Sequence, residues 1–257
     1  GYSNSRDANF GVFSVGTGSD HPNPGNDVLY RGRNDDIQGN FFTVRSYTSH
    51  TDYYSAYRLE TTGDPDYSLQ SLAAYDPVVS SVPAGLRTTW TVTGSDSLTI
   101  VQNVINEGSE FEDARVRVTT TVTNNGAAPV DIGIRYAWDW DMGADDVIKK
   151  HDPDDADFSA VAAWFDEAPN FSYFEWNGPG FTAYGTCNGP THMAPQPTPP
   201  DRLYYCARIN MTHYSWTFDQ DYQGCLNPTD GAVCYFWGDA ATNAITLNSG
   251  QSYSVTQ

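Results

Sequence analysis

Two β-strands and the turn between them stand out in residues 114–141, which read ARVRVTTTVTNNGAAPVDIGIRYAWDWD. From Ala114 to Asn124, small or apolar residues alternate with Arg and Thr. This period of two is typical of a strand with one buried face. Asn124-Asn125-Gly126 then predicts a turn. The alternation resumes at Ile132, with Ile, Tyr and Trp on one face and Gly133, Arg135, Ala137, Asp139 and Asp141 on the other.

The rest of the chain repeats this pattern of short apolar or alternating runs between Gly, Asn, Asp and Pro clusters. It predicts an all-β protein, a single large antiparallel β-sandwich over residues 1–257 with little helix beyond one turn near Ser68–Ala74. Three long strands at 86–93, 98–105 and 114–124 should form an antiparallel meander. Further strands are expected at 10–15, 41–47, 160–165, 171–176, 203–209, 213–218, 234–237 and 252–256.

The composition restricts the partners. The chain has 257 residues, with 32 acidic against 13 basic side chains and a net charge of -19. Such a charge repels nucleic acid phosphates and anionic membrane surfaces, so neither is an expected partner. No run reaches the roughly 18 apolar residues that a membrane helix needs. The chain begins at Gly1 without a hydrophobic leader, which suggests an exported protein whose signal has been removed and an extracellular location.

The cysteines favour disulfides over metal binding. Cys187, Cys206, Cys225 and Cys234 lack Cys-x-x-Cys spacing, and no His lies beside them at zinc-ligand spacing. Of the three pairings, Cys187–Cys206 and Cys225–Cys234 are preferred because each closes a short loop; buried free thiols are the alternative. The first pair would tie the ends of a proline-rich excursion within 187–206. Sequons at Asn170 and Asn210 predict glycosylation and agree with export.

A cluster of carboxylates follows the strand that ends near Asp141. Carboxylates gathered at a strand end can bind a hard cation, and calcium is the expected ion. The cluster does not match an EF-hand, because Gly143 and Lys150 occupy positions that need oxygen ligands. A solvated acidic face is the alternative, and Asp139 and Asp141 can also neutralise Arg135. The candidate ligands are Asp139, Asp141, Asp145, Asp146, Asp152 and Asp154.

No catalytic residue is predicted. The five His residues are scattered, and the chain has neither a nucleophile elbow nor a His-Glu-x-x-His motif. Carboxylate pairs such as Glu167 and Glu175 resemble a glycosidase pair but arise easily among so many acids. Several aromatic side chains are candidates for stacking on sugar rings. They are Tyr173, Trp176, Tyr204, Tyr205 and Trp216.

One stretch resembles a known family. Thr89-Trp90-Thr91-Val92, the Asn124-Asn125-Gly126 turn and Arg135-Tyr136 followed by Asp139-Trp140-Asp141 are similar to the supersandwich domains related to galactose mutarotase. The closing turn at 247–251 also resembles them. The resemblance covers about residues 80–146 and 247–257. It implies a fold and occurrence in exported prokaryotic surface proteins, but the His and Glu of the sugar-epimerising members have no counterpart here.

These features favour a structural subunit of an extracellular filament, sheath or surface layer that self-associates into a homopolymer. A carbohydrate-binding module or a polysaccharide-active enzyme is the alternative, with glycans as partners. Residues 1–16 have the form of a strand donated to a neighbouring subunit, with eight polar residues before an alternating apolar segment. Pairing of this segment within its own chain is the other possibility. The assembly residues are Phe10, Val12, Phe13 and Val15.

Overall fold

The computed structural model describes the backbone of residues 11–13, 15–25, 29, 40–55, 64–108, 114–139, 149–152, 155–159, 163–165, 173–175, 195–207, 215–216 and 231–257. Between 149 and 175, and at 205–207 and 231, the description covers the backbone alone. Every structural statement below concerns these residues.

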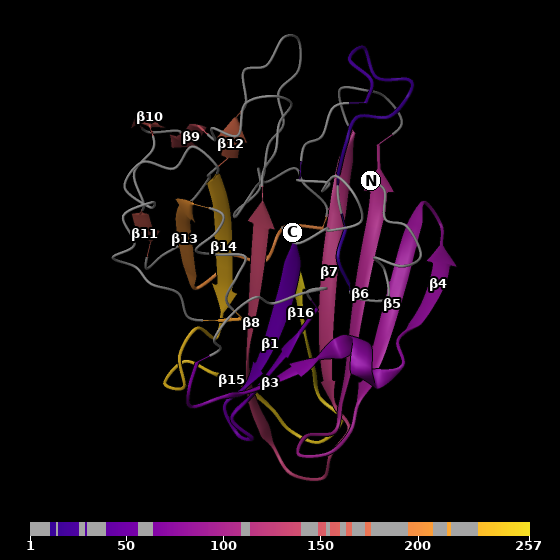
Figure 1. Ribbon diagram of the computed structural model, residues 1–257, viewed down its shortest axis with the longest axis vertical. Helices are drawn as coiled ribbons and strands as arrows, with labels where there is room; N and C mark the ends of the chain where they lie inside the picture. The colour runs from indigo at the N-terminus through magenta and orange to yellow at the C-terminus, as the bar shows by residue number, and fades with distance from the viewer. Residues whose placement is uncertain are drawn as a thin grey trace.

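The chain folds into two main antiparallel sheets, with the prediction of an all-β architecture confirmed (Figure 1). The first has five strands in the order β16-β7-β6-β5-β4. Its members are β4 (Val78–Val82), β5 (Gly85–Val92), β6 (Leu98–Glu107), β7 (Arg115–Asn124) and β16 (Ser252–Thr256). The predicted meander of three long strands is confirmed as β5, β6 and β7.

The second sheet has eight strands in the order β11-β13-β14-β8-β1-β2-β3, with β15 also paired to β8. Among the described strands of this sheet, β2 and β3 form the one parallel pair. Its members are β1 (Phe41–Ser46), β2 (Thr51–Tyr54), β3 (Ser68–Ser71), β8 (Val130–Asp139), β11 (Ala163–Phe165), β13 (Arg202–Ala207), β14 (Gly231–Trp237) and β15 (Ile245–Leu247). A smaller third sheet joins β9 (Lys149–Asp152), β10 (Asp155–Ser159) and β12 (Tyr173–Glu175).

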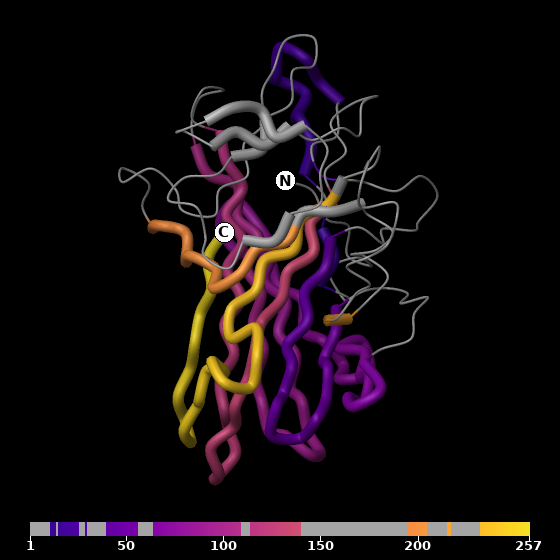
Figure 2. Tube along the Cα trace, turned by 90° about the vertical axis from the view of Figure 1, so that its left-hand side faces the viewer, coloured from indigo at the N-terminus to yellow at the C-terminus, as the bar shows by residue number. Residues whose placement is uncertain are grey.

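One hydrophobic core lies between the two main sheets, as expected for a sandwich. Phe42 of β1 packs edge-on against Trp90 of β5, with ring centroids 5.6 Å apart. Tyr136 of β8 reaches across the core and accepts a hydrogen bond from Gln102 of β6 at 2.9 Å. Buried side chains of both sheets, apolar and polar, therefore hold the layers together, and Figure 2 shows these strands running along the long axis of the molecule.

A short 3₁₀ helix, η1 (Leu72–Tyr75), connects β3 of one sheet to β4 of the other. Leu72 is fully buried in the core, and Tyr75 packs against it. The helical turn expected near Ser68–Ala74 therefore begins later, because Ser68–Ser71 pairs with β2 as a strand.

Two further strand predictions were wrong in their described parts. Gly11–Phe13 and Val15 form no strand, and Ser215–Trp216, within the strand expected at 213–218, is a bend. Both segments contribute buried side chains without joining a sheet ladder, and an alternating pattern does not distinguish these two situations.

The proline-rich segment was expected to be an extended surface excursion. Its described part, residues 195–200, indeed has neither helix nor strand, but Pro197 and Pro200 are buried. Thr198 donates its backbone N–H to Thr256 O at 2.8 Å and accepts a hydrogen bond from Trp237 Nε1 at 3.1 Å. Residues 195–200 therefore connect β16 of one sheet to β14 of the other, instead of extending away from the sandwich.

Candidate functional site

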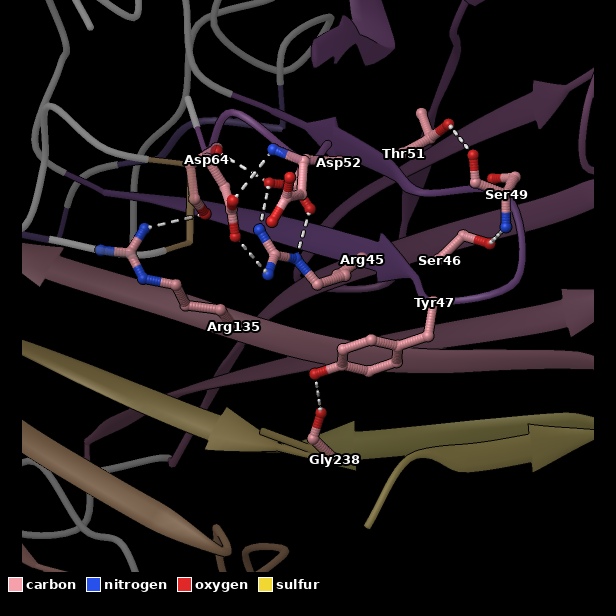
Figure 3. Close-up of polar contacts among 11 residues, drawn as sticks. Arg45, Ser46, Tyr47, Ser49, Thr51, Asp52, Asp64, Arg135 and Gly238 are labelled. Carbon is pink, nitrogen blue, oxygen red and sulfur yellow. Dashed lines mark hydrogen bonds and ion pairs between the residues drawn. The ribbon is translucent and has the colours of Figure 1, made fainter. Parts of the chain in front are cut away.

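A buried polar cluster lies on the outer face of the eight-stranded sheet, centred on Arg45 (Figure 3). Arg45 of β1 and Asp52 of β2 are direct cross-strand partners. Arg45 donates from Nε to Asp52 Oδ1 at 2.7 Å and from Nη2 to Asp52 Oδ2 at 2.9 Å, a two-pronged ion pair. Nη1 makes a third contact with Asp64 Oδ2 at 3.1 Å. Both members of the central pair are buried, so the guanidinium is neutralised inside the protein.

Aromatic rings lie against the same guanidinium. The Arg45 Cζ atom lies 3.6 Å from the ring centroid of Tyr67 and 4.9 Å from that of Trp216. His50 stacks on Tyr67 with centroids 5.2 Å apart. Cation–π contacts of this kind strengthen when they are shielded from water.

A second buried guanidinium continues the cluster. Arg135 of β8 donates from Nη1 to the backbone carbonyl of Ser215 at 3.1 Å and from Nη2 to Cys234 Sγ at 3.0 Å. Ser215 in turn donates its hydroxyl to Asp52 Oδ2 at 2.9 Å. Ser215 thereby links the two arginines.

The cluster fastens two loop segments onto the sheet. Asp64 and Tyr67 come from one segment, Ser215 and Trp216 from another, and all four contact Arg45, Asp52 or Arg135. Trp216 sits where Gly133 leaves space, since a Cβ at that position would lie 2.7 Å from Trp216 Cη2. Arg45 is neutralised by Asp52 and Asp64, and Arg135 donates to a carbonyl and a thiol of the same cluster, which is the chemistry of a structural network.

Sequence reasoning missed Arg45, Asp52 and Asp64. A usable signal was present, because Arg45 and Asp52 each stand in a short strand that otherwise carries no charge, FFTVRS and TDYY. Oppositely charged residues in two consecutive strands joined by a short turn predict a cross-strand pair.

The predicted cation ligands are only partly described. Asp139 ends β8 and is buried, with its backbone N–H bonded to Asn40 Oδ1 at 2.8 Å. Asp152 lies in β9, with its backbone opposite Asp155 of β10. Asp141, Asp145, Asp146 and Asp154 lie outside the described residues. Within the part of the chain that is described, no three metal-ligating side chains converge.

Calcium binding therefore stays a prediction. If the acidic loop binds the ion, calcium raises the melting temperature of the protein, and replacing Asp139 and Asp141 together by Asn abolishes that rise. The same response in wild type and variant would contradict the site.

The preferred pairing of Cys225 with Cys234 was wrong for Cys234. This residue is a free thiol, fully buried in the middle of β14 rather than in a loop. Burial raises the pKa of the Cys234 thiol, and the nearby Arg135 only partly opposes this effect. Cys187 and Cys225, like Asn170 and Asn210, lie outside the described residues, and Cys206 is described only as a backbone position in β13.

Two of the five candidate sugar-stacking residues belong to the interior. Tyr204 and Trp216 are buried at 2% and 4% exposure, and both join the second hydrophobic cluster on the outer face of the larger sheet. The side chains of Tyr173, Trp176 and Tyr205 lie outside the described residues. A sugar ring cannot stack on a face that other side chains already cover.

The N-terminal segment packs into the main core. Val12 and Phe13 are buried, and Val15 packs against the core at its margin. Phe13 meets Trp138 edge-on at 6.0 Å between centroids. Phe10 lies outside the described residues.

Comparison with known proteins found no matching family model and no matching curated protein. None of the helices in the described residues has the length and apolarity needed to cross a membrane.

Proposed function

We propose that this protein is a structural subunit of an extracellular assembly, and that neighbouring subunits are joined through the N-terminal segment. The observation that carries this proposal is that Phe13 joins the core of the sandwich and Val12 is buried, while the described part of their segment belongs to neither main sheet. The sequons at Asn170 and Asn210, which agree with export, support an extracellular role.

Because the segment is buried, it stabilises whichever chain it packs into. Burying side chains of the size of Val and Phe contributes about 1.5–3 kcal/mol each. Phe13 lies against Trp138 of β8, and a Cβ at Gly11 would lie 2.7 Å from Trp90 of β5, so the segment touches both sheets. Its removal would leave a gap between them.

Among the described residues, the segment is joined to the rest of the chain by few backbone hydrogen bonds. Leu29 donates its backbone N–H to Val15 O at 3.0 Å, and Gly16 and Leu29 each take part in a single bridge rather than a ladder. Exchange of a terminal segment between identical subunits replaces each contact by the same contact between chains, so its cost in free energy is small. A head-to-tail exchange builds a ring where the rotation between subunits closes and an open polymer where it does not, and the proposed assembly is the open case.

Two deletions test the proposal. Removing residues 1–16 takes away the core-filling segment, whereas removing residues 1–8 takes away only the polar residues before it and serves as the matched control. Electron microscopy and sedimentation of each protein should show polymers for the full chain and for the shorter deletion, and none for the longer one.

A peptide of residues 9–16 separates assembly from folding. Added to the longer deletion, it should raise the melting temperature by refilling the core but should not restore polymers, because a free peptide does not link two subunits. Polymers formed without residues 1–16, or a full-length chain that stays monomeric at all concentrations, would contradict the proposed function.

A further inference from the structure

The five-stranded sheet ends in an open edge at β4. Within the described residues β4 pairs with β5 alone, and Figure 1 shows it as the outermost strand on its side of the sheet. Val78, at 64%, is the exposed large hydrophobic side chain of the described chain. Exported proteins commonly protect such an edge with charged side chains, and β4 has none.

The hydrogen-bonding direction of each β4 residue follows from one contact. Asn106 of the β6 strand donates its backbone N–H to Ala84 O at 2.9 Å, so the backbone groups of Ala84 point toward β6. Because these directions alternate along an antiparallel strand, the groups of Gly85 point toward β4. Gly85 pairs with Val82 of β4, so the backbone groups of Val82 point toward β5. By the same alternation, those of Ser80 and Val78 also point toward β5. The backbone groups of Val79 and Ser81 therefore point away from the sheet.

Prolines flank this outward-facing pair. Pro77 and Pro83 stand two residues beyond Val79 and Ser81, in the same alternation, where an ordinary residue would offer an outward N–H. An arbitrary added strand would place its own N–H and C=O groups opposite two residues that cannot donate. The edge can therefore pair with another strand only between the two prolines. It favours a partner strand that places no hydrogen-bond acceptor in need of an N–H opposite Pro77 or Pro83.

We propose that β4 pairs antiparallel with β4 of a second copy of this chain, about a two-fold axis at Ser80. In this register Val79 of each copy exchanges hydrogen bonds with Ser81 of the other. Pro77 of each copy meets Pro83 of the other, so neither strand leaves an N–H opposite a missing donor. The strand is self-complementary in this register.

The side chains fit the same register. Val78 of each copy lies opposite Val82 of the other on the solvent face, so the exposed valine gains an apolar cross-strand partner. Residues 77–86 carry no charge in a chain whose net charge is -19. Two strongly acidic copies can therefore approach at this edge without opposing carboxylates.

This contact goes beyond the proposed function and does not depend on it. A two-fold contact is isologous and closes into a dimer. Combined with exchange of the N-terminal segment it would cross-connect polymers, and without that exchange it still pairs two copies.

Cysteine cross-linking of the full chain tests the pairing and its register. Ser80 faces Ser80 of the partner at a non-hydrogen-bonded position, where Cα atoms lie about 4.5 Å apart, within the range that a disulfide spans. Ser80→Cys should therefore form a covalent dimer on mild oxidation, read on a non-reducing denaturing gel. Val78→Cys is the matched control, because the two copies of residue 78 are far apart. The double variant Val78→Cys/Val82→Cys should restore the dimer.

A second variant tests the hydrogen bonds. Ser81→Pro removes an outward N–H without touching the β4–β5 ladder, so it should abolish the dimer in sedimentation while leaving the melting temperature nearly unchanged. The proposal would be overturned if Ser80→Cys gave no more covalent dimer than the wild type. It would also be overturned if Val78→Cys gave as much covalent dimer as Ser80→Cys. Cross-linking by Ser80→Cys in a protein that forms no polymers would support this inference while the proposed function fails.

Discussion

The two main sheets differ in what covers their outer faces. The outer face of the five-stranded sheet carries Thr91, Thr99, Thr123 and Ser252 in one row across four strands, each at least partly exposed to solvent. The outer face of the eight-stranded sheet is covered over its central strands: β1 is buried along its full length and β8 along nearly all of it. Both sheets alternate apolar and polar residues in sequence, so alternation alone does not reveal whether the polar face meets water or other protein segments.

Arginine shows the consequence of this difference. Arg87 lies on the exposed face of β5 and donates from Nε to Asn103 Oδ1 at 2.8 Å. Arg45 lies on the buried face of β1 and is bound by Asp52, Asp64 and two aromatic rings. The same residue type is a replaceable surface group in one sheet and an anchor of two segments in the other.

Replacing these two arginines gives the largest expected contrast. Arg45→Met leaves the buried Asp52 carboxylate without its ion pair, and breaking such a pair typically costs about 3–5 kcal/mol of unfolding free energy. The exposed Arg87→Met should cost no more than about 0.5 kcal/mol. Chemical denaturation of both variants measures the difference, and equal losses would mean that the outer-face cluster does not fasten the fold.

The space above Gly133 gives the next contrast. A Cβ at this position would lie 2.3 Å from Gly238 O and 2.7 Å from Trp216 Cη2, whereas a Cβ at Gly18 meets nothing within 4 Å. We expect Gly133→Ala to destabilise the protein by about 1–3 kcal/mol, because Trp216 or the backbone must move. The matched Gly18→Ala should be close to neutral. Thermal melting compares them, and tolerance of Ala at 133 would place Trp216 elsewhere.

Replacing the buried thiol of Cys234 should have an effect no larger than that at Gly133. Cys234→Ala removes an acceptor for Arg135 Nη2 and should cost about 1–3 kcal/mol, while Cys234→Ser keeps an acceptor and should cost less. In the native wild type, the raised pKa and full burial of the thiol should prevent alkylation. Alkylation of unreduced, denatured protein should then label Cys234. Absence of this label would show that Cys234 forms a disulfide after all.

The smallest effect is expected at Glu107, where β6 pairs with β7. Burial raises the pKa of Glu107, but hydrogen bonds and charge from Arg115 and Arg117 outweigh it and leave the pKa below its ordinary value. A lowered pKa in the folded state adds stability above the unfolded pKa, and this stability is lost as the pH falls through the folded pKa. Since these side chains are partly exposed, the gain should stay below about 1 kcal/mol.

Denaturation of wild type and Glu107→Gln at several pH values measures this gain. The difference in unfolding free energy should be present near neutral pH and shrink as the pH falls below about 4. A difference that grows on acidification would contradict the assigned cause.

The sequence predicted the exposed-face sheet much better than the covered one. β5, β6, β7 and β16 follow the expected ranges closely, because one solvated face leaves a clear alternating pattern. The expected turn at 124–126 is also followed, but β8 then crosses into the other sheet, paired to β1 and β14.

Burial of the outer face of the eight-stranded sheet could not be predicted from the alternating pattern. Arg135 and Asp139 look like a polar, solvated face in sequence, yet both are buried beneath segments distant along the chain. The partners that make this burial possible, such as Ser215 and Trp216, lie in a segment whose sequence pattern predicts a strand and not a cover for another sheet. Burial by long-range cover is a property of the whole fold and not of a local pattern.

Photo-cross-linking from position 13 tests the central claim most directly. A photoreactive phenylalanine in place of Phe13 lies beside Trp138 in either arrangement, because exchange preserves the contact. If neighbouring subunits supply the segment, illumination of the full-chain assembly should produce a ladder of covalently linked chains on a denaturing gel. Cross-links confined to single chains within assembled material would contradict the account.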